Sequence, residues 1–281
     1  MDTLKTHKIT LGLPWYAGPD VDCYPYYFMF MNYFGRLKER SIWYHAFEEN
    51  RREAAYKELK LPPLDALIED GDKAELRPED GLFHFDLAIE RMSLPGLARE
   101  RIVDMALANG SEWLFWWDAD MLFPPSIFLR LFRHQKPVVN ALAFTSRDPV
   151  QPCLYRIKEG FDPMTHEPMF DSETVFDIPD KPLISDEDID GRMAFGAGVC
   201  LYNMNVFRQI PKPWFNSTGC GEDWFFCVRA ARYGVPRYCD TSIPLRHKAF
   251  QPRFYDKLLY EQARKEQPDV YKNLMERKIA T

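Results

Sequence analysis

The stretch that decides the fold is Trp113–Met121, which reads W-L-F-W-W-D-A-D-M. Its first five residues are apolar and do not alternate with polar ones, a pattern typical of a strand that is covered on both faces in a parallel sheet. The strand runs directly into Asp118 and Asp120. Because ligands of open α/β sheets bind beyond the carboxyl ends of the strands, the sequence predicts that both acids lie at a ligand-binding edge.

The segments around this strand predict alternating helices and strands. From Ser93 onward apolar residues recur at the helical period, and Gly110 stands where a helix commonly ends. Beyond the two acids, Pro124 begins a helix that is expected to reach Phe132, and Val138–Phe144 is a second apolar strand. Helices and strands in this order imply right-handed crossovers. We therefore expect an α/β fold with a mainly parallel central sheet flanked by helices.

The composition favours a packed, soluble protein. Of the 281 residues, 46% are hydrophobic and 15% are aromatic, which is enough for a sizeable core. The net charge of −6 gives no global positive field that would draw the chain onto nucleic acid. The six cysteines form no C-x-x-C pair, so no zinc ribbon or thioredoxin-type motif is indicated, and their wide scatter favours reduced thiols in a cytosolic protein. Neither a signal peptide nor an apolar run of roughly 20 residues is present, so we expect a cytoplasmic protein without an integral membrane segment.

The two aspartates could hold a divalent cation. Residues i and i+2 of an extended segment point to the same side, so Asp118 and Asp120 can converge on one ligand. Carboxylate oxygens suit Mg²⁺ or Mn²⁺ ions that bridge phosphate oxygens. The alternative is that the two acids only cap the following helix, because a D-x-D pair alone is a weak signal. The buried aromatic strand before them favours the functional interpretation.

Further downstream, two other groups could take part in chemistry. Glu222 and Asp223 stand at a predicted helix start, where the helix dipole favours acids, although a carboxylate there could also act as general base on an acceptor hydroxyl. His247 could complete a metal shell as a neutral imidazole, whereas an isolated histidine is more often structural.

Small residues and one arginine complete the candidates. Gly196, Ala197 and Gly198 interrupt a strand-like segment, and such residues let another group approach the backbone closely. Arg99 lies on the helix before the aspartate strand. Its side chain could reach phosphates, or it could simply belong to the solvated face of that helix.

Taken together, these blocks resemble GT-A-fold glycosyltransferases of the family 2 type. The resemblance covers roughly residues 95–250 and rests on the order and spacing of Leu97–Arg101, Trp113–Met121, Phe123–Pro125, Phe195–Val199, Gly221–Phe226 and His247. It implies a GT-A, Rossmann-like fold and the transfer of a sugar from a nucleotide-sugar donor, most simply a UDP-sugar.

The resemblance also implies a role for each block. Asp120 would bind Mn²⁺ or Mg²⁺ with His247 as a further ligand, and Asp118 would contact the nucleoside of the donor. Asp223 would be the catalytic base, and Glu222 beside it would orient the acceptor. The donor-binding set would comprise Pro14 and Trp15 around the base, Arg99 at the diphosphate, Asp118, Ala119 and Asp120, and Gly196, Ala197 and Gly198 along the sugar.

We expect a single domain over residues 1–250. Residues 46–92 depart from the family pattern and are expected to be an insertion, and residues 155–192 are expected to be a variable acidic loop. The charged pattern of residues 251–281 predicts a C-terminal helical tail.

The expected reaction is a single displacement with inversion at the anomeric carbon. The acceptor would be a saccharide or another hydroxyl, and a hydroxymethylated base in viral DNA is the alternative, for which Arg246 and Lys248 could supply part of a basic path. A nucleotidyltransferase would more naturally show a glycine-rich basic loop after the first strand, which Leu11–Gly18 lacks. A non-catalytic carbohydrate-binding protein would not explain the acidic pairs and the histidine in family order.

Overall fold

The computed structural model describes residues 6–14, 31, 80, 82–90, 94–146, 148–161, 168–216, 221–248 and 254–277. Within these residues a seven-stranded sheet forms the centre of the fold, and its strand order is β2-β1-β3-β10-β5-β11-β8. In that order the strands span Leu82–Glu90, Thr6–Pro14, Trp113–Trp117, Val199–Asn203, Val138–Ala141, Tyr238–Asp240 and Leu183–Ser185. All run parallel except β10 and β8, which are antiparallel to their neighbours. The predicted α/β fold with a mainly parallel sheet is confirmed.

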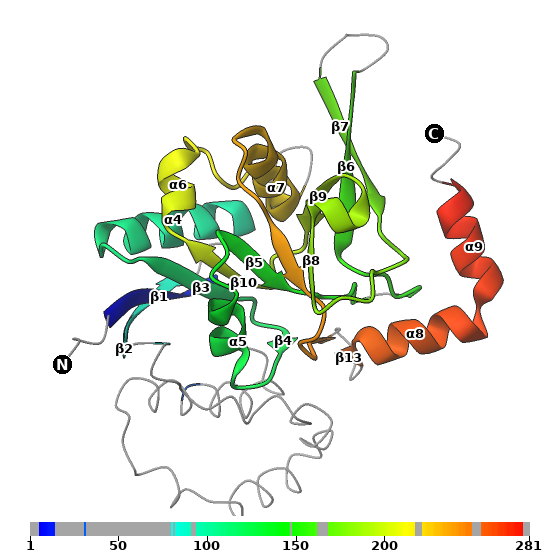
Figure 1. The fold of residues 1–281 in the computed structure, drawn as a ribbon, viewed down its shortest axis with the longest axis horizontal. Helices are drawn as coiled ribbons and strands as arrows, with labels where there is room; N and C mark the ends of the chain where they lie inside the picture. Colours follow the sequence, from blue (N-terminus) through cyan, green and yellow to red (C-terminus); the bar gives the residue numbers. More distant parts are fainter. Residues whose placement is uncertain are drawn as a thin grey trace, which may run out of the picture.

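Helices cover both faces of this sheet, with α4, α6 and α7 on one face and α5 on the other (Figure 1). The described helices are α4 (Pro95–Ala108), α5 (Ile127–Arg133), α6 (Asn205–Gln209), α7 (Glu222–Arg232), α8 (Lys257–Glu266) and α9 (Pro268–Arg277). None of them combines the length and the apolar character that a membrane crossing requires.

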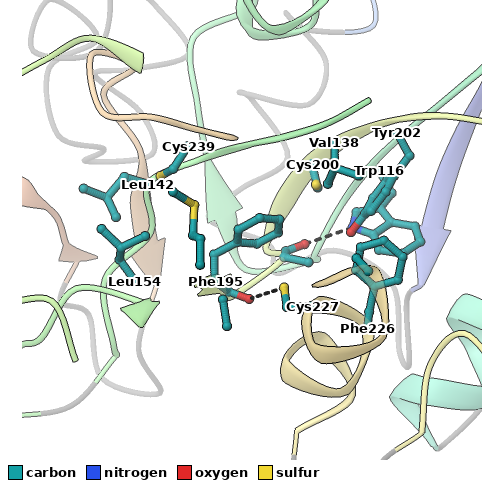
Figure 2. Packing of buried hydrophobic residues seen from close by; sticks show 14 of the residues in the cluster. Trp116, Val138, Leu142, Leu154, Phe195, Cys200, Tyr202, Phe226, Cys227 and Cys239 are labelled. Atoms are coloured by element: carbon teal, nitrogen blue, oxygen red, sulfur yellow. Dashed lines mark hydrogen bonds between the residues drawn. The ribbon is translucent and has the colours of Figure 1, made fainter. Parts of the chain in front are cut away.

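Strand β3 is buried on both of its faces. Leu114 and Trp116 belong to the apolar cluster that includes residues of α4 and α7, whereas Phe115 and Trp117 belong to the cluster that includes α5. Figure 2 shows the first cluster, in which the Trp116 ring lies 4.6 Å from the ring of Tyr202. The two-sided burial explains why β3 shows no alternation of polar and apolar residues.

Helix α4 lies close against the sheet because β1 carries a glycine at the crossing. A Cβ atom added at Gly12 would lie 2.7 Å from Ile102 Cγ2, 3.1 Å from Leu114 Cδ1 and 3.2 Å from Trp116 Cβ. These atoms come from the helix and from the neighbouring strand, so no free space surrounds the glycine. The small residue therefore sets the distance between α4 and the strands that end at the candidate site.

The substitution Gly12→Ala is expected to lower the free energy of unfolding by about 1–3 kcal/mol, the usual cost of forcing a methyl group into a packed core. The cost arises because Ile102 and two strand residues must move together. Urea unfolding followed by tryptophan fluorescence would measure it. An unchanged midpoint would show that α4 can shift freely on the sheet.

A small sheet joins the aspartate turn to a distant part of the chain. Its order is β13-β12-β4, where β4 spans Met121–Leu122, β12 spans Arg246–Lys248 and β13 spans Phe254–Tyr255. In this antiparallel pairing His247 lies opposite Met121. His247 therefore belongs to a strand that pairs with the end of the aspartate turn.

Strand β2 corrects one expectation about the insertion. Leu82–Glu90, expected to belong to the insertion at residues 46–92, pairs with β1 in parallel along its whole length. The alternation of apolar residues from Phe83 to Ile89 is a strand pattern, which the proline and glycine residues just before it obscure. Residues 46–79 lie outside the described residues, and the domain limits at residues 1–250 stay a prediction.

Residues 155–192 also differ from the expected acidic loop. They contain most of β6 (Leu154–Phe161), β7 (Pro168–Thr174), β8, the 3₁₀ helix η4 (Asp186–Ile189) and the start of β9 (Arg192–Phe195). Their acids have structural partners: Asp186 accepts hydrogen bonds of 2.8 and 3.1 Å from the buried Arg237, and Asp188 forms a capping box with Ser185. Because Arg237 lies about fifty positions away, the local sequence pattern does not reveal this order.

The C-terminal helices α8 and α9 dock onto the body through two tyrosines. The Tyr260 hydroxyl donates to the Phe176 carbonyl at 2.6 Å, and the Tyr271 hydroxyl donates to the Val150 carbonyl at 2.8 Å. The Tyr260 ring also lies 5.3 Å from the ring of Phe144. The tail is thus helical over its described residues, and it packs against the segment that follows β5.

Candidate functional site

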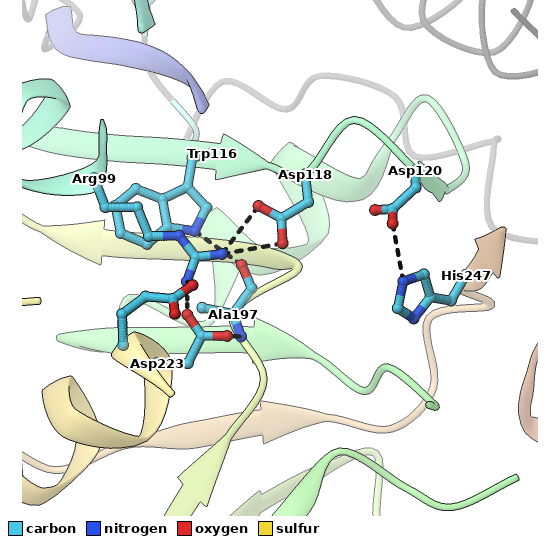
Figure 3. Close-up of polar contacts among 8 residues, drawn as sticks. Arg99, Trp116, Asp118, Asp120, Ala197, Asp223 and His247 are labelled. Atoms are coloured by element: carbon cyan, nitrogen blue, oxygen red, sulfur yellow. Dashed lines mark hydrogen bonds and ion pairs between the residues drawn. The ribbon is translucent and has the colours of Figure 1, made fainter. Parts of the chain in front are cut away.

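The candidate site lies where β3 ends in the turn that contains Asp118 and Asp120 (Figure 3). The Met121 N–H donates to the Asp118 carbonyl at 3.2 Å, which closes the turn. The Asp118 N–H donates to the Gly198 carbonyl at 2.8 Å, and the Lys248 N–H donates to the Asp120 carbonyl at 2.9 Å. Backbone hydrogen bonds from two distant segments therefore fix the turn from both sides.

The two aspartate side chains point to different partners. Both oxygens of Asp118 accept from the Arg99 guanidinium at 3.0 Å, whereas Asp120 Oδ2 lies 3.1 Å from His247 Nε2. The predicted convergence of Asp118 and Asp120 on one ligand is therefore not what the structure has. The i, i+2 rule holds for an extended strand, and these residues stand in a turn.

His247 is oriented by a second hydrogen bond. Its Nδ1–H donates to the Phe144 carbonyl at 2.8 Å, which leaves Nε2 facing Asp120. Burial lowers the pKa of His247, but the hydrogen bond and the charge of Asp120 outweigh it, so the pKa lies above its ordinary value. The Phe144 carbonyl and the Asp120 carboxylate therefore fix the orientation of the imidazole.

Arg99 is buried and not part of a solvated helix face. Only 3% of its side chain is exposed, and its guanidinium contacts Asp118, Glu222 and Asp223. Burial opposes its charge, but the carboxylates of Asp118 and Glu222 raise the pKa of Arg99 above its ordinary value. The spacing carries a signal for this position, because Arg99 stands three residues before Ile102 on the buried stripe of α4.

The first turn of α7 supplies the two other acids. The Asp223 Oδ2 atom accepts from the Ala197 N–H at 2.9 Å, and Glu222 Oε1 lies 3.0 Å from Arg99 NH1. The Ala197 carbonyl in turn accepts from Trp116 Nε1 at 2.9 Å. The structure therefore brings together four of the sequence-predicted blocks: those that contain Arg99, Asp118, Ala197 and the two acids of α7. It also adds Trp116, which the sequence indicates only as a core residue.

Burial also changes the pKa of Asp118, which accepts hydrogen bonds from Arg99. Desolvation raises the pKa of Asp118, and the Arg99 charge opposes this shift. Three carboxylates thus contact one guanidinium at this end of β3.

Other predicted donor-side residues lie around the turn. Pro14 ends β1, next to β3 in the sheet, and Ala119 stands between the two aspartates. A Cβ at Gly198 would lie 2.5 Å from Met121 Cε, so this glycine allows the close approach that the sequence predicts. Trp15 lies outside the described residues. The donor-binding roles of all these residues stay predictions.

Within the described residues, no three His, Cys, Asp or Glu side chains are grouped so as to hold a metal ion. Asp120 and His247 are therefore a pair of candidate ligands, and Asp118, the third residue predicted for the metal, faces Arg99 instead. The remaining ligands of any bound ion would have to come from outside this pair.

Comparison with known proteins gives one local sequence match. No protein-family model matches the chain. Over 114 residues, which are 39% of this chain, it is 30% identical to the mannan polymerase complex subunit MNN9 of Candida albicans. The match spans 30% of that protein, so the chain corresponds to less than a third of its relative's length.

Two solved structures show a distant likeness to this chain. The protein A197 from STIV has a TM-score of 0.45 at 11% identity, with 89% of this chain and 93% of that chain covered. A UDP-glucose pyrophosphorylase complexed with UDP-glucose has a TM-score of 0.41 at 11% identity, with 95% and 100% covered. Likeness at this level supports no argument about activity. The sheet topology agrees with the predicted mainly parallel α/β fold, and the local match to a mannan polymerase complex subunit supports the predicted resemblance to glycosyltransferases.

Proposed function

We propose that this chain is a glycosyltransferase that moves a sugar from a nucleotide-sugar donor to an acceptor hydroxyl with the help of a divalent cation. The observation that carries the proposal is the placement of two chemically different groups on either side of one turn. Asp120 and His247 lie on one side, and Asp118 and Asp223 meet Arg99 on the other. A transfer reaction needs such a division between the leaving group and the attacking hydroxyl.

The donor atoms of Asp120 and His247 fit a divalent cation. Carboxylate oxygen and imidazole nitrogen lie 3.1 Å apart, and the Phe144 carbonyl orients the imidazole from behind. A mixed oxygen and nitrogen pair suits Mn²⁺ better than Mg²⁺, which is bound almost entirely by oxygen. When bound, such a cation would offset the charge of the departing nucleoside diphosphate.

Asp223 is the residue that we assign as general base. One of its oxygens accepts from the Ala197 N–H and the other contacts Arg99, so the carboxylate is held in a fixed orientation. A carboxylate has about four lone-pair directions, so one can still accept the proton of an acceptor hydroxyl. Glu222, which also contacts Arg99, would orient the acceptor. We propose inversion, because a single base on the acceptor side suits a single displacement.

The local sequence match supports our proposal for the substrates. The matched relative is named as a subunit of a mannan polymerase complex. We therefore propose a saccharide acceptor, and we add nucleotide-activated mannose to the UDP-sugars as a donor candidate.

The test is release of nucleoside diphosphate from a panel of UDP- and GDP-sugars, with Mn²⁺ and a mannose oligosaccharide as acceptor. We expect one donor to be consumed, and excess EDTA to abolish its consumption because Asp120 and His247 then lack their ion. Full turnover in EDTA would contradict the role of the metal. A nucleotidyltransferase would instead release pyrophosphate from a nucleoside triphosphate and a sugar phosphate, and a binding protein would release neither product. Proton NMR of the product would establish inversion or retention.

A further inference from the structure

Arg99 joins parts of the site that come from separate segments of the chain. One of its terminal nitrogens donates to both oxygens of Asp118 at 3.0 Å. The other lies 3.0 Å from Glu222 and also contacts Asp223. Asp118 belongs to the turn after β3, whereas both other acids begin α7, more than a hundred residues later. A single side chain thus spans the donor side and the acceptor side (Figure 3).

The environment makes this arginine a rigid connector. Its guanidinium carbon lies 5.2 Å from the centre of the Trp116 ring, a cation–π contact with a residue of β3. A guanidinium cannot lose its proton in a protein, and its donors have a fixed planar geometry. Because the side chain is 3% exposed, its charge is costly to bury unless the carboxylates stay in place.

The contacts close into a ring. Arg99 contacts Asp223, the Ala197 N–H donates to Asp223, and Trp116 Nε1 donates to the Ala197 carbonyl beneath the same guanidinium. The next residue, Gly198, accepts from the Asp118 N–H, so the glycine-rich segment is also tied to the turn. A displacement of Asp223 relative to Asp118 would break several of these contacts at once.

We propose that Arg99 is a positioning residue, whose guanidinium fixes the Asp223 carboxylate relative to the Asp118 turn. This inference rests on the proposed function, because it gives Arg99 a part in that reaction. It replaces the predicted contact between Arg99 and the donor diphosphate. The guanidinium is buried and already faces three carboxylates of the protein, and one of its nitrogens donates to both oxygens of Asp118.

Lysine should be unable to take over this role. Its ammonium is a point charge and lacks the fork that contacts Asp118 through one nitrogen and the α7 acids through the other. Arg99→Lys therefore keeps the charge and removes the connection. Arg101→Lys is the matched control. Arg101 lies on the same helix, but its side chain is 50% exposed and its ion pair with Glu90 is long, at 3.7 Å.

The experiment is a kinetic double-mutant cycle on the full chain with Arg99→Lys, Asp223→Asn and the double variant. Arg99→Lys is expected to lower kcat roughly 10- to 100-fold and to change the donor KM by less than about threefold, because misplacement of a reacting group affects turnover more than binding. Arg101→Lys should leave both constants unchanged. In the Asp223→Asn background, Arg99→Lys should lower kcat by less than about threefold further, since the group that it positions is already gone.

Other outcomes separate the inference from the proposed function. If the kcat of the double variant falls by the product of the two single losses, the two residues act independently and the positioning role is wrong. A wild-type kcat in Arg99→Lys would also overturn it. A raised donor KM with normal kcat would make Arg99 a donor-binding residue and would also overturn it. If circular dichroism shows that Arg99→Lys does not fold, the same cycle is run with Glu222→Gln in every variant. This change removes one of the three carboxylates that contact residue 99, so that the lysine charge faces fewer acids. Absence of nucleoside diphosphate release by the wild type would instead mean that the proposed function itself has failed.

Discussion

Replacing Asp120 by asparagine is expected to lower metal-dependent turnover by roughly 100- to 1000-fold, the scale on which loss of one charge-stabilising group acts in enzymes. The asparagine side chain has the size of the aspartate side chain but lacks the negative charge that faces His247 Nε2 at 3.1 Å. The fold should be unaffected, because the Asp120 side chain is 48% exposed and the turn is held by backbone hydrogen bonds.

Two measurements check this prediction. Mn²⁺ titration followed by electron paramagnetic resonance should show weaker binding in Asp120→Asn and in His247→Ala, and turnover should fall in parallel. Asp86→Asn is the control, because Asp86 also faces a histidine, His84, at 3.5 Å, but in the middle of β2. Unchanged Mn²⁺ affinity in both site variants would place the metal elsewhere or remove it from the reaction.

The C-terminal helices also contact a residue that orients His247. Phe144 orients His247 through its carbonyl and packs its ring 5.3 Å from Tyr260 on α8. The helical tail therefore supports the segment that fixes the imidazole. This contact gives residues of α8 a structural link to the site, although the sequence indicates only a charged helical tail.

The fold could be predicted from the sequence where the local pattern of apolar residues matches their burial in the structure. The five apolar residues of β3 indicated a strand covered on both faces, and α4 ends before Gly110, whose φ of +70° suits glycine. The family resemblance predicts that His247 and Asp120 bind the same metal ion, and the pairing of β12 with β4 brings the two side chains together across 127 positions.

The parts that sequence reasoning missed depend on long-range contacts. The spacing on α4 indicates that Arg99 is buried, but the acids that contact it lie 19 to more than 120 positions away, and no local pattern encodes these contacts. The separation of Asp118 from Asp120 follows from a turn closed by the Met121 N–H, which a two-residue period does not reveal. Order in residues 155–192 depends in the same way on the distant Arg237.

Replacing Asp223 by asparagine is expected to lower kcat roughly 100-fold or more, the range that loss of a general base covers. Asparagine retains an oxygen that can accept from the Ala197 N–H, but it cannot take a proton from the acceptor hydroxyl. The donor KM and the Mn²⁺ affinity should stay near wild type, because Asp120 and His247 lie on the other side of the turn.

Glu222→Gln provides the matched comparison for this prediction. Glu222 stands beside Asp223 in the same helical turn and contacts the same guanidinium at 3.0 Å, but it does not accept from the Ala197 N–H. If Asp223 is the base, its variant should lose far more kcat than Glu222→Gln at equal thermal stability. If Glu222→Gln shows the larger loss, the assignment of the two acids must be exchanged. Within the described residues, Glu222 and Asp223 are the two acids that contact Arg99 from α7. Normal turnover in both variants would therefore show that the first turn of α7 takes no part in the reaction.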